Sequence, residues 1–218
     1  PRAKQVDGGR YLARIDVLAK RYTSDWVAGW RGFESSEGRP DPVFLLGFPR
    51  SGTTLLDTIL HSHPGISITE ERPTIRKVRN ALERLPGGDP DGLAELDGAQ
   101  IKQLRDVYFA ELDKHLDPND TASLIVDKNP LNTVEAGLIH RIFPHARFLF
   151  VQRHPCDCVL SCFMQNFDPN DAMINFLDLE SAAHLYDRVM TLWQQYREVL
   201  PLVVHTVRYE TLIEGFEE

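Results

Sequence analysis

Short apolar runs alternate with helix-like stretches along most of this chain of 218 residues. Runs typical of buried strands occupy residues 43–46, 66–68, 124–126, 147–152 and 203–207. Between them, helical spacing or helix start signals occur at about 53–61, 73–84, 101–115, 131–142, from 155 onward and at 177–199. Strands separated by helices predict right-handed crossovers, so we expect an α/β fold with a central parallel β-sheet flanked by helices.

Residues 1–40 have a different pattern from the rest of the chain. They are partly amphipathic at helical spacing and then rich in turn residues, which indicates a helical lead-in before a main domain at 41–218. A chain of this length is sufficient for one domain with a sizeable core. Because Pro1 is not an initiator methionine, we expect the sequence to be a fragment of a longer protein.

The overall composition is that of an ordinary globular protein, with 42% hydrophobic and 26% charged residues. A net charge of −8 argues against a nucleic-acid partner, and no apolar run approaches the ~20 residues of a membrane span. The three cysteines lie in one short segment, at Cys156, Cys158 and Cys162. This usage fits a reducing compartment, so we expect a cytoplasmic protein whose thiols pack a helix rather than bind zinc.

The loop after the first strand has the pattern of a phosphate-binding loop. The strand ends in a segment bounded by Gly47 and Gly52, and a helix follows at once. This order places backbone N–H groups and a helix N-terminus around an anion. The pattern resembles the Walker A motif, but Thr53 replaces the lysine that normally reaches the β- and γ-phosphates of a nucleotide. That replacement, with Arg50 nearby, argues against ATP and for another phosphorylated donor.

Polar residues follow the predicted strands at the edge where parallel sheets bind ligands. The candidates are Arg50, Ser51, Gly52, Thr53 and Thr54 after the first strand, and Glu70, Glu71, Asp127, Lys128, Arg153 and Tyr209 after the later ones. An anion loop with three cations and a carboxylate at one edge predicts a site for a donor with two separated anionic groups. Arg50 and the loop amides would hold one group, and Arg153 with Ser161 would hold the other.

Four segments together resemble the sulfotransferases, which use 3′-phosphoadenosine 5′-phosphosulfate (PAPS) as the sulfuryl donor. The segments are GFPRSGTT, DKNPLN, RHPCDCVLS and VRYETL, within about residues 42–212. The pattern is most similar to bacterial sulfotransferase domains that often follow tetratricopeptide repeats, and is more distantly similar to tyrosylprotein sulfotransferases. The resemblance implies a P-loop-type three-layer fold and transfer of the sulfuryl group to an acceptor hydroxyl by in-line displacement, without a metal ion.

The resemblance also implies how the donor is bound. Residues 49–54, which include Arg50, would bind the 5′-phosphosulfate end. Arg153 and Ser161 match the arginine and serine that bind the 3′-phosphate, and Tyr209 matches a tyrosine at the nucleotide. Because the 3′-phosphate separates PAPS from ATP, the Arg153 and Ser161 pair would carry the specificity for the donor.

The catalytic residues implied by the resemblance are Glu71, Lys128 and Arg50. Glu71 lies 21 residues after Arg50, the spacing of the catalytic glutamate in tyrosylprotein sulfotransferases, and is the expected base. Lys128 matches a lysine that contacts the transferring sulfuryl group, and with Arg50 it would stabilise charge on the leaving oxygen. Proton removal and charge stabilisation are thus both assigned to side chains of the protein.

Two departures from the family pattern bear on these expectations. His154, Pro155 and Cys156 stand where relatives often carry Asp-Pro-Arg, which removes a charge next to the expected 3′-phosphate site. Relatives also continue beyond the helix start at Tyr209 with a segment that closes over the nucleotide. We therefore expect the C-terminal part of the domain to be missing from this sequence.

The acceptor and the oligomeric state stay open at this point. A peptide tyrosine, a glycan, a lipid or a small molecule would each suit a glutamate base. A P-loop nucleotide kinase or NTPase and a non-catalytic nucleotide-binding module also remain as alternatives. Arg72, Arg76 and Arg79 recur at helical spacing after Glu71, and we expect a solvated helix face there rather than a basic wall for an acidic acceptor. Residues 166–178 form either an acceptor-side flap or a surface loop.

Overall fold

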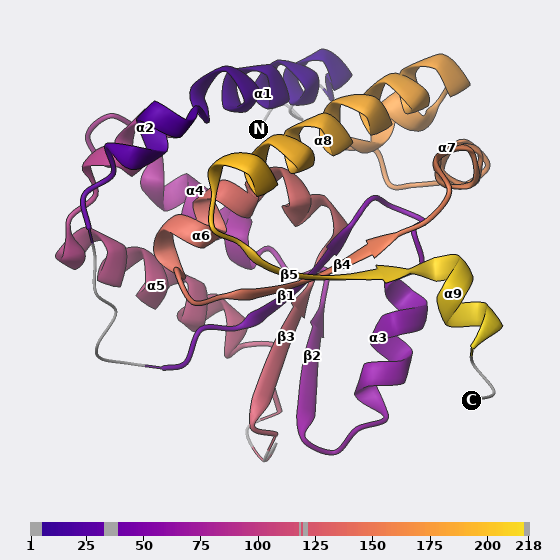
Figure 1. Cartoon of the computed structure of the whole chain (residues 1–218), viewed down its shortest axis with the longest axis horizontal. Helices are drawn as coiled ribbons and strands as arrows, with labels where there is room; N and C mark the ends of the chain where they lie inside the picture. Colours follow the sequence, from indigo (N-terminus) through magenta and orange to yellow (C-terminus); the bar gives the residue numbers. More distant parts are fainter. Residues whose placement is uncertain (1–5, 33–38, 118, 120–121, 216–218) are drawn as a thin grey trace.

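A five-stranded parallel sheet forms the centre of the molecule (Figure 1). The structure, a computed structural model, describes residues 6–32, 39–117, 119 and 122–215; parts of the expected lead-in and of the end of the expected domain lie outside these ranges. The strands are β1 (Val43–Gly47), β2 (Ile66–Glu70), β3 (Leu124–Lys128), β4 (Arg147–Gln152) and β5 (Val203–Arg208). Their order is β2-β3-β1-β4-β5, and neighbouring strands pair in parallel.

Helices cover both faces of this sheet. One face carries α1 (Gly8–Arg21), α4 (Thr74–Leu82), α5 (Gly98–Leu112), α6 (Ala136–Ile142) and α8 (Leu179–Val199), and the other carries α3 (Thr53–His61) and α9 (Tyr209–Glu214) (Figure 1). The other helices are α2 (Ser24–Ala28) and α7 (Pro155–Phe163), with 3-10 turns η1 (Asp91–Glu95), η2 (Pro130–Glu135) and η3 (Met173–Phe176). The predicted three-layer α/β fold is confirmed.

The central strand β1 explains how the two layers are held to the sheet. Successive side chains of a strand point to opposite faces. Phe44 and Leu46 therefore enter the larger core cluster beneath α4, α5, α6 and α8, whereas Val43 and Leu45 enter the smaller cluster beneath α3. All of these residues are buried, as expected for a strand covered on both faces.

The N-terminal helix α1 packs into the same core as the main sheet. Ile15 and Leu18 of α1 are buried in the larger cluster together with Tyr22. Arg14 of α1 forms a 2.7 Å ion pair with Glu135 at the end of η2 and a second ion pair with Asp89. The lead-in is thus tied to the domain by both apolar packing and largely buried charge. The division at residue 40 stays a prediction.

β1 and β5 each extend one residue further than the sequence predicts, and β2 and β3 each extend two residues further. β2 and β3 were expected to end at residues 68 and 126, but their ladder continues until Glu70 pairs with Lys128. Glu70 and Lys128 remain in the sheet because they neutralise one another across the two strands. The expected helix at 131–142 is also divided, into η2 and α6.

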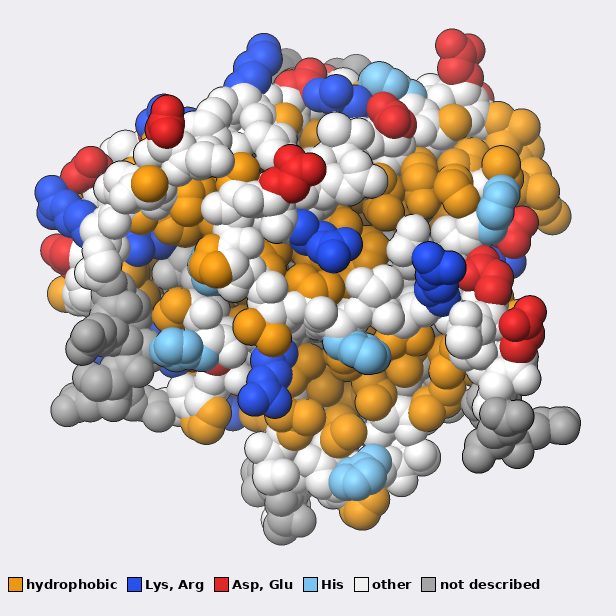
Figure 2. Space-filling model, in the orientation of Figure 1, with side chains coloured by type: hydrophobic (Ala, Val, Ile, Leu, Met, Phe, Trp, Pro, Cys, Tyr) orange, Lys and Arg blue, Asp and Glu red, His pale blue; other side chains and the backbone are white. Residues whose placement is uncertain are grey.

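Apolar side chains gather on the surface where α7 and the start of α8 lie (Figure 2). The exposed large apolar residues of this region are Leu160, Phe163, Met164, Leu177 and Leu179. Leu160 and Met164 also line a cavity of the candidate site described below. Of the helices within the described ranges, none has the length and apolar character needed to cross a membrane.

Candidate functional site

The loop between β1 and α3 approaches its neighbours too closely to carry side chains at two positions. A Cβ at Gly47 would lie 2.6 Å from Ser51 Oγ and 2.9 Å from the Val151 carbonyl oxygen. Gly52 precedes α3 with φ of 100°, and a Cβ there would overlap the ring of Tyr209. Space therefore requires glycine at both ends of the predicted phosphate loop, and at Gly52 the backbone conformation requires it as well.

Arg50 and Glu71 have φ of 67° and 52°, and are the non-glycine residues with positive φ in the described part of the chain. This region of backbone conformation costs an ordinary residue on the order of 1–3 kcal/mol, and such residues cluster at functional sites. Both side chains line the same cavity. The backbone strain is therefore located where the sequence predicts chemistry.

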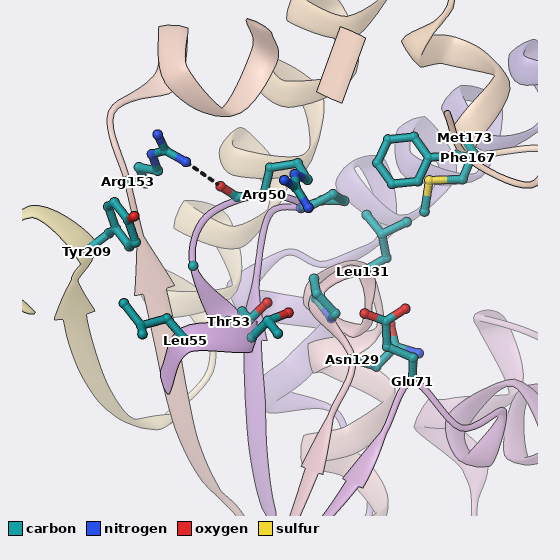
Figure 3. Close-up of a pocket in the computed structure, with 14 residues that line it drawn as sticks. Arg50, Thr53, Leu55, Glu71, Asn129, Leu131, Arg153, Phe167, Met173 and Tyr209 are labelled. Atoms are coloured by element: carbon teal, nitrogen blue, oxygen red, sulfur yellow. Dashed lines mark hydrogen bonds between the residues drawn. The ribbon is translucent and has the colours of Figure 1, made fainter. Parts of the chain in front are cut away.

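A cavity of about 320 Å³ lies beyond the carboxyl ends of the strands, at the edge predicted for ligand binding. Figure 3 shows Arg153 and Tyr209 at one end, Arg50 and Thr53 in the middle, and Glu71 at the other end with its carboxylate pointing into the cavity. Of the predicted residues, the cavity brings together Arg50, Gly52, Thr53, Thr54, Glu71, Arg153 and Tyr209. Ser51, Lys128 and Ser161 are outside this lining.

A second cavity, of about 370 Å³, adjoins the outer side of the loop and is lined by α7. It shares Arg50 and Arg153 with the first cavity and adds Ser161 and Asp157. The Arg153 guanidinium donates a 3.2 Å hydrogen bond to the Arg50 carbonyl oxygen, and its Cζ lies 4.6 Å from the centre of the Tyr209 ring. Arg153 therefore links the phosphate loop to the start of α9, between the two cavities.

Two buried donors in this region have no hydrogen-bond partner among the described residues. They are Ser51 Oγ and Arg153 Nε. Ser51 is only 1% exposed, and a buried polar group without a partner costs free energy. Together with the N-terminus of α3 and the Arg50 guanidinium, these donors fit anionic groups with separate oxygen atoms, such as the two ends of a nucleoside 3′,5′-bisphosphate.

Lys128 lies beneath the first cavity rather than in its lining, and its side chain is fully buried. Its Nζ is 2.8 Å from Glu70 Oε1 and 3.3 Å from Glu71 Oε1, while Asp57 Oδ2 is at 3.8 Å and Thr54 Oγ1 at 3.5 Å. The hydrogen bond from Lys128 lowers the pKa of Glu70. Burial raises the pKa of Asp57, although the charge of Lys128 opposes that shift. The ammonium thus joins the predicted base to two further carboxylates.

Two residues that hold the phosphate loop were missed by the sequence analysis. The Gly47 N–H donates to Thr133 Oγ1 over 3.1 Å, and this oxygen is also 2.9 Å from the Gly47 carbonyl oxygen. Cys162 Sγ lies 3.3 Å from the Pro49 carbonyl oxygen. Cys162 therefore packs a helix, as predicted, and also contacts the loop; no periodicity distinguishes Thr133 in the sequence.

The wall of the cavity beside Glu71 is largely apolar, which the sequence analysis did not predict. Its residues are Pro130, Leu131, Phe167 and Met173. Leu131 falls in the DKNPLN block, but nothing in the irregular pattern of residues 166–178 singles out Phe167 or Met173. The segment 166–178 therefore contributes to the cavity, and its role as an acceptor-side flap stays a prediction.

The other candidates from the sequence, Asp127 and the three arginines after Glu71, do not line either cavity. Asp127, expected after a strand, lies inside β3 and is fully buried. Arg72 and Arg76 are exposed, whereas Arg79 turns inward and forms a 2.8 Å ion pair with Glu135. A continuous basic wall of these three arginines is therefore excluded. Within the described residues there is no cluster of three or more His, Cys, Asp or Glu side chains that could hold a metal ion.

Comparisons with known proteins point to one family. An uncharacterized protein of Aquifex aeolicus is 30% identical over 185 residues, 81% of this chain and 24% of that protein. A protein-tyrosine sulfotransferase of Drosophila melanogaster is 25% identical over 201 residues, 90% of this chain and 37% of that protein. The crystal structure of a sulfotransferase from Alicyclobacillus acidocaldarius has the same fold, with a TM-score of 0.50 and 17% identity over 82% of this chain and 76% of that one.

The chain matches only part of the length of its curated relatives, but the family model matches most of the chain. The chain spans 24% and 37% of the lengths of the two curated relatives described above, so the activities of those whole proteins do not transfer to it directly. The model of the sulfotransferase family, in contrast, matches residues 42–218. That match includes the phosphate loop, Glu71, Lys128, Arg153, Ser161 and Tyr209. By this match, the chain belongs to the sulfotransferase family.

Proposed function

We propose that this protein transfers the sulfuryl group of PAPS to an acceptor hydroxyl by in-line displacement. The observation that carries the proposal is the pair of cavities that share Arg50 and Arg153 on either side of the phosphate loop. Two adjoining anion sites suit a donor with a 5′-phosphosulfate and a separate 3′-phosphate. Membership in the sulfotransferase family supports the same reaction class.

The donor would be held by residues from three strand ends. Ser51, Gly52, Thr53 and Thr54 present the loop and the start of α3 to the 5′ end. Arg153 and Ser161 would hold the 3′-phosphate, with Tyr209 beside the nucleotide. The unpaired Nε of Arg153 and Oγ of Ser51 support this assignment, because each is a buried donor in need of an acceptor.

Glu71 would act as the general base. It takes the proton of the acceptor hydroxyl while the acceptor oxygen forms its bond to sulfur and the bond from sulfur to the bridging oxygen breaks. The electron pair of the broken bond leaves with the 3′,5′-bisphosphate. Arg50 and Lys128 would stabilise this charge, a contribution of order 2.7–4 kcal/mol for a preorganised group. These residues supply the needed charge without a metal ion.

The acceptor would enter beside Glu71, along the wall formed by Leu131, Phe167 and Met173. This wall favours an acceptor with apolar surface next to its hydroxyl, as in a phenol. The similarity to a protein-tyrosine sulfotransferase supports peptide tyrosine as the first acceptor to test. Glycans, lipids and small molecules form the other arms of the same test.

Binding and transfer measurements distinguish this proposal from its alternatives. A 3′,5′-bisphosphate at 100 times its Kd should stabilise the protein by about 2.7 kcal/mol in thermal unfolding, and ATP should not. Stabilisation by ATP alone would indicate a kinase or NTPase. Labelled PAPS is then offered with each acceptor class, and transfer to at least one is expected. Bisphosphate binding without transfer to any class would indicate a non-catalytic module.

A further inference from the structure

Strand β3 holds both ends of the short segment that carries Glu71. At one end, the Glu71 N–H donates a 2.7 Å hydrogen bond to the Lys128 carbonyl oxygen. At the other end, Thr74 Oγ1 donates a 2.7 Å hydrogen bond to Asp127 Oδ2. Asp127 and Lys128 are adjacent residues at the end of β3. The segment from Glu71 to Thr74 is therefore fixed at two points to one rigid element.

Asp127 is an unusual residue for the interior of a sheet. Its side chain is fully buried, Oδ2 accepts hydrogen bonds from Thr74 on α4 and from Tyr108 on α5, and Oδ1 has no partner among the described residues. Burial raises its pKa to about 6, against the opposing effect of the two hydroxyl donors. A buried acid with one unpaired oxygen costs stability relative to an apolar side chain. A role in positioning explains why this cost is tolerated.

The backbone between the two contacts is the part that needs support. Glu71 has φ of 52°, which a non-glycine residue keeps only when the structure on both sides fixes it. Thr74 is the first residue of α4, so the bond to Asp127 fixes where that helix begins. Without it, Glu71 can relax toward negative φ. Such a change would turn its carboxylate away from the cavity and from Lys128 Nζ, now 3.3 Å away.

We propose that Asp127, acting through the hydroxyl of Thr74, is a positioning residue that holds Glu71 in the orientation required of the base. This inference rests on the proposed function, in which Glu71 removes the acceptor proton. Neither Asp127 nor Thr74 lines either of the cavities described above. Their effect on turnover would therefore pass through the segment from Glu71 to Thr74.

Two hydroxyls on the same carboxylate oxygen allow a matched test. Thr74→Val and Tyr108→Phe each remove one hydrogen bond to Asp127 Oδ2, but only Thr74 is connected to the Glu71 segment. Thr74→Val should lower kcat by about 10- to 100-fold, as for a misplaced catalytic group, while the Kd of 3′,5′-bisphosphate changes by less than about twofold. Tyr108→Phe should leave kcat within about twofold, and Thr74→Ser should restore most of it.

Hydrogen exchange gives a second measurement that does not depend on turnover. Exchange of the Glu71 amide should accelerate in Thr74→Val and stay near wild type in Tyr108→Phe, because only the first releases the segment. Thr74→Ala replaces Thr74→Val if the valine variant does not fold. Equal kcat for the two hydroxyl variants, whether unchanged or equally reduced, would overturn the positioning role.

The outcome for Glu71→Ala separates this inference from the proposed function. One outcome is that Glu71→Ala loses turnover while Thr74→Val and Tyr108→Phe have equal kcat. That result would overturn the positioning role of Asp127 but still support Glu71 as the base. Wild-type turnover in Glu71→Ala would overturn the base, and the positioning role with it. Loss of turnover in both Glu71→Ala and Thr74→Val, with Tyr108→Phe active, supports both.

Discussion

The Nε of Arg50 donates a 3.0 Å hydrogen bond to Ser161 Oγ and so joins the phosphate loop to α7. These residues are 111 positions apart, and the sequence assigns them to opposite ends of the donor. Arg50 also lines both cavities. The proposed sites for the 5′-phosphosulfate and the 3′-phosphate are therefore connected through one side chain. Because Ser161 Oγ accepts this hydrogen bond, its O–H can still donate to a bound anion.

Ser161→Ala tests the proposed 3′-phosphate contact. Loss of a hydrogen bond to a charged group costs about 1.5–3 kcal/mol, so the Kd of 3′,5′-bisphosphate should rise by about tenfold or more. The Kd of the 5′-monophosphate should change by less than about twofold. Calorimetric titration with both ligands measures the difference. Ser62→Ala, at the far end of α3 from the loop, is the control, and equal changes for both ligands would contradict the assignment.

Arg153→Ala, like Ser161→Ala, should weaken binding of ligands that carry a 3′-phosphate more than binding of ligands that lack it. The loss should be larger than in Ser161→Ala. The guanidinium would bind the 3′-phosphate through charge-assisted hydrogen bonds, so the Kd of PAPS should rise by about 100-fold, and that of adenosine 5′-phosphosulfate much less. Arg153 also supports the Arg50 carbonyl oxygen, so a small loss with the second ligand is expected. Equal losses with both ligands would show that Arg153 acts only through the loop.

Glu71→Gln and Glu70→Gln separate proton removal from the neutralisation of Lys128. Both glutamates accept a hydrogen bond from Lys128 Nζ, but only Glu71 lines the cavity. Loss of a general base lowers kcat by about 10²–10⁴-fold, which is the effect expected for Glu71→Gln with bisphosphate binding nearly intact. Glu70→Gln should cost less than about tenfold. Similar losses in the two variants would indicate that the pair acts through Lys128 instead.

Gly52→Ala tests whether the loop requires the space next to Tyr209. Alanine at positive φ loses about 1–2 kcal/mol, and the overlap with the Tyr209 ring adds to that loss. Gly88→Ala is a matched control, because Gly88 has φ of 63° and open space around it. Gly52→Ala should therefore lower the unfolding free energy more than Gly88→Ala in urea titrations. Adding Tyr209→Ala should recover part of the difference, and a purely additive double variant would contradict the overlap.

The sequence predicts well those features that depend on strand order and strand ends. The carboxyl ends of parallel strands meet at one edge, so Arg50, Glu71, Arg153 and Tyr209 could be expected near one cavity before any contact was known. Glu70 and Lys128 were predicted to follow their strands, although a charge in isolation is unfavourable in a sheet only until it is paired. Their mutual ion pair, which joins residues 58 positions apart, removes that cost and is invisible in either segment alone.

Residues outside regular elements could not be predicted in the same way. Thr133 holds Gly47 from a 3-10 turn, and Phe167 and Met173 reach the cavity from a segment without periodicity. Their positions depend on how α7 and α8 pack on the sheet. Hydrophobic pattern fixes which residues of an element face the core, but it does not fix the path of an irregular connection. The acceptor wall is therefore the part of the site that most needed the structure.

Asp127 gives a pH dependence of stability whose sign is opposite to that of a salt-bridged aspartate. Its pKa is about 6 in the folded protein, against 3.8 for an ordinary aspartate, so between these values the folded state binds more protons than the unfolded state. The contribution of Asp127 to stability is then present at the acidic end and is lost as the pH rises from about 4 to about 6. The difference between these pKa values corresponds to about 3 kcal/mol.

Asp127→Asn isolates this contribution, because asparagine keeps an oxygen for Thr74 and Tyr108 but does not titrate. The unfolding free energy of the wild type minus that of Asp127→Asn should fall by about 3 kcal/mol in all, about 2 kcal/mol of it between pH 4 and 6, and should level off above about pH 7. Urea titrations at several pH values measure it, with Asp106→Asn on the exposed face of α5 as the control for the substitution itself. A difference that is flat or rises with pH would mean that the buried carboxylate is better solvated than its contacts indicate.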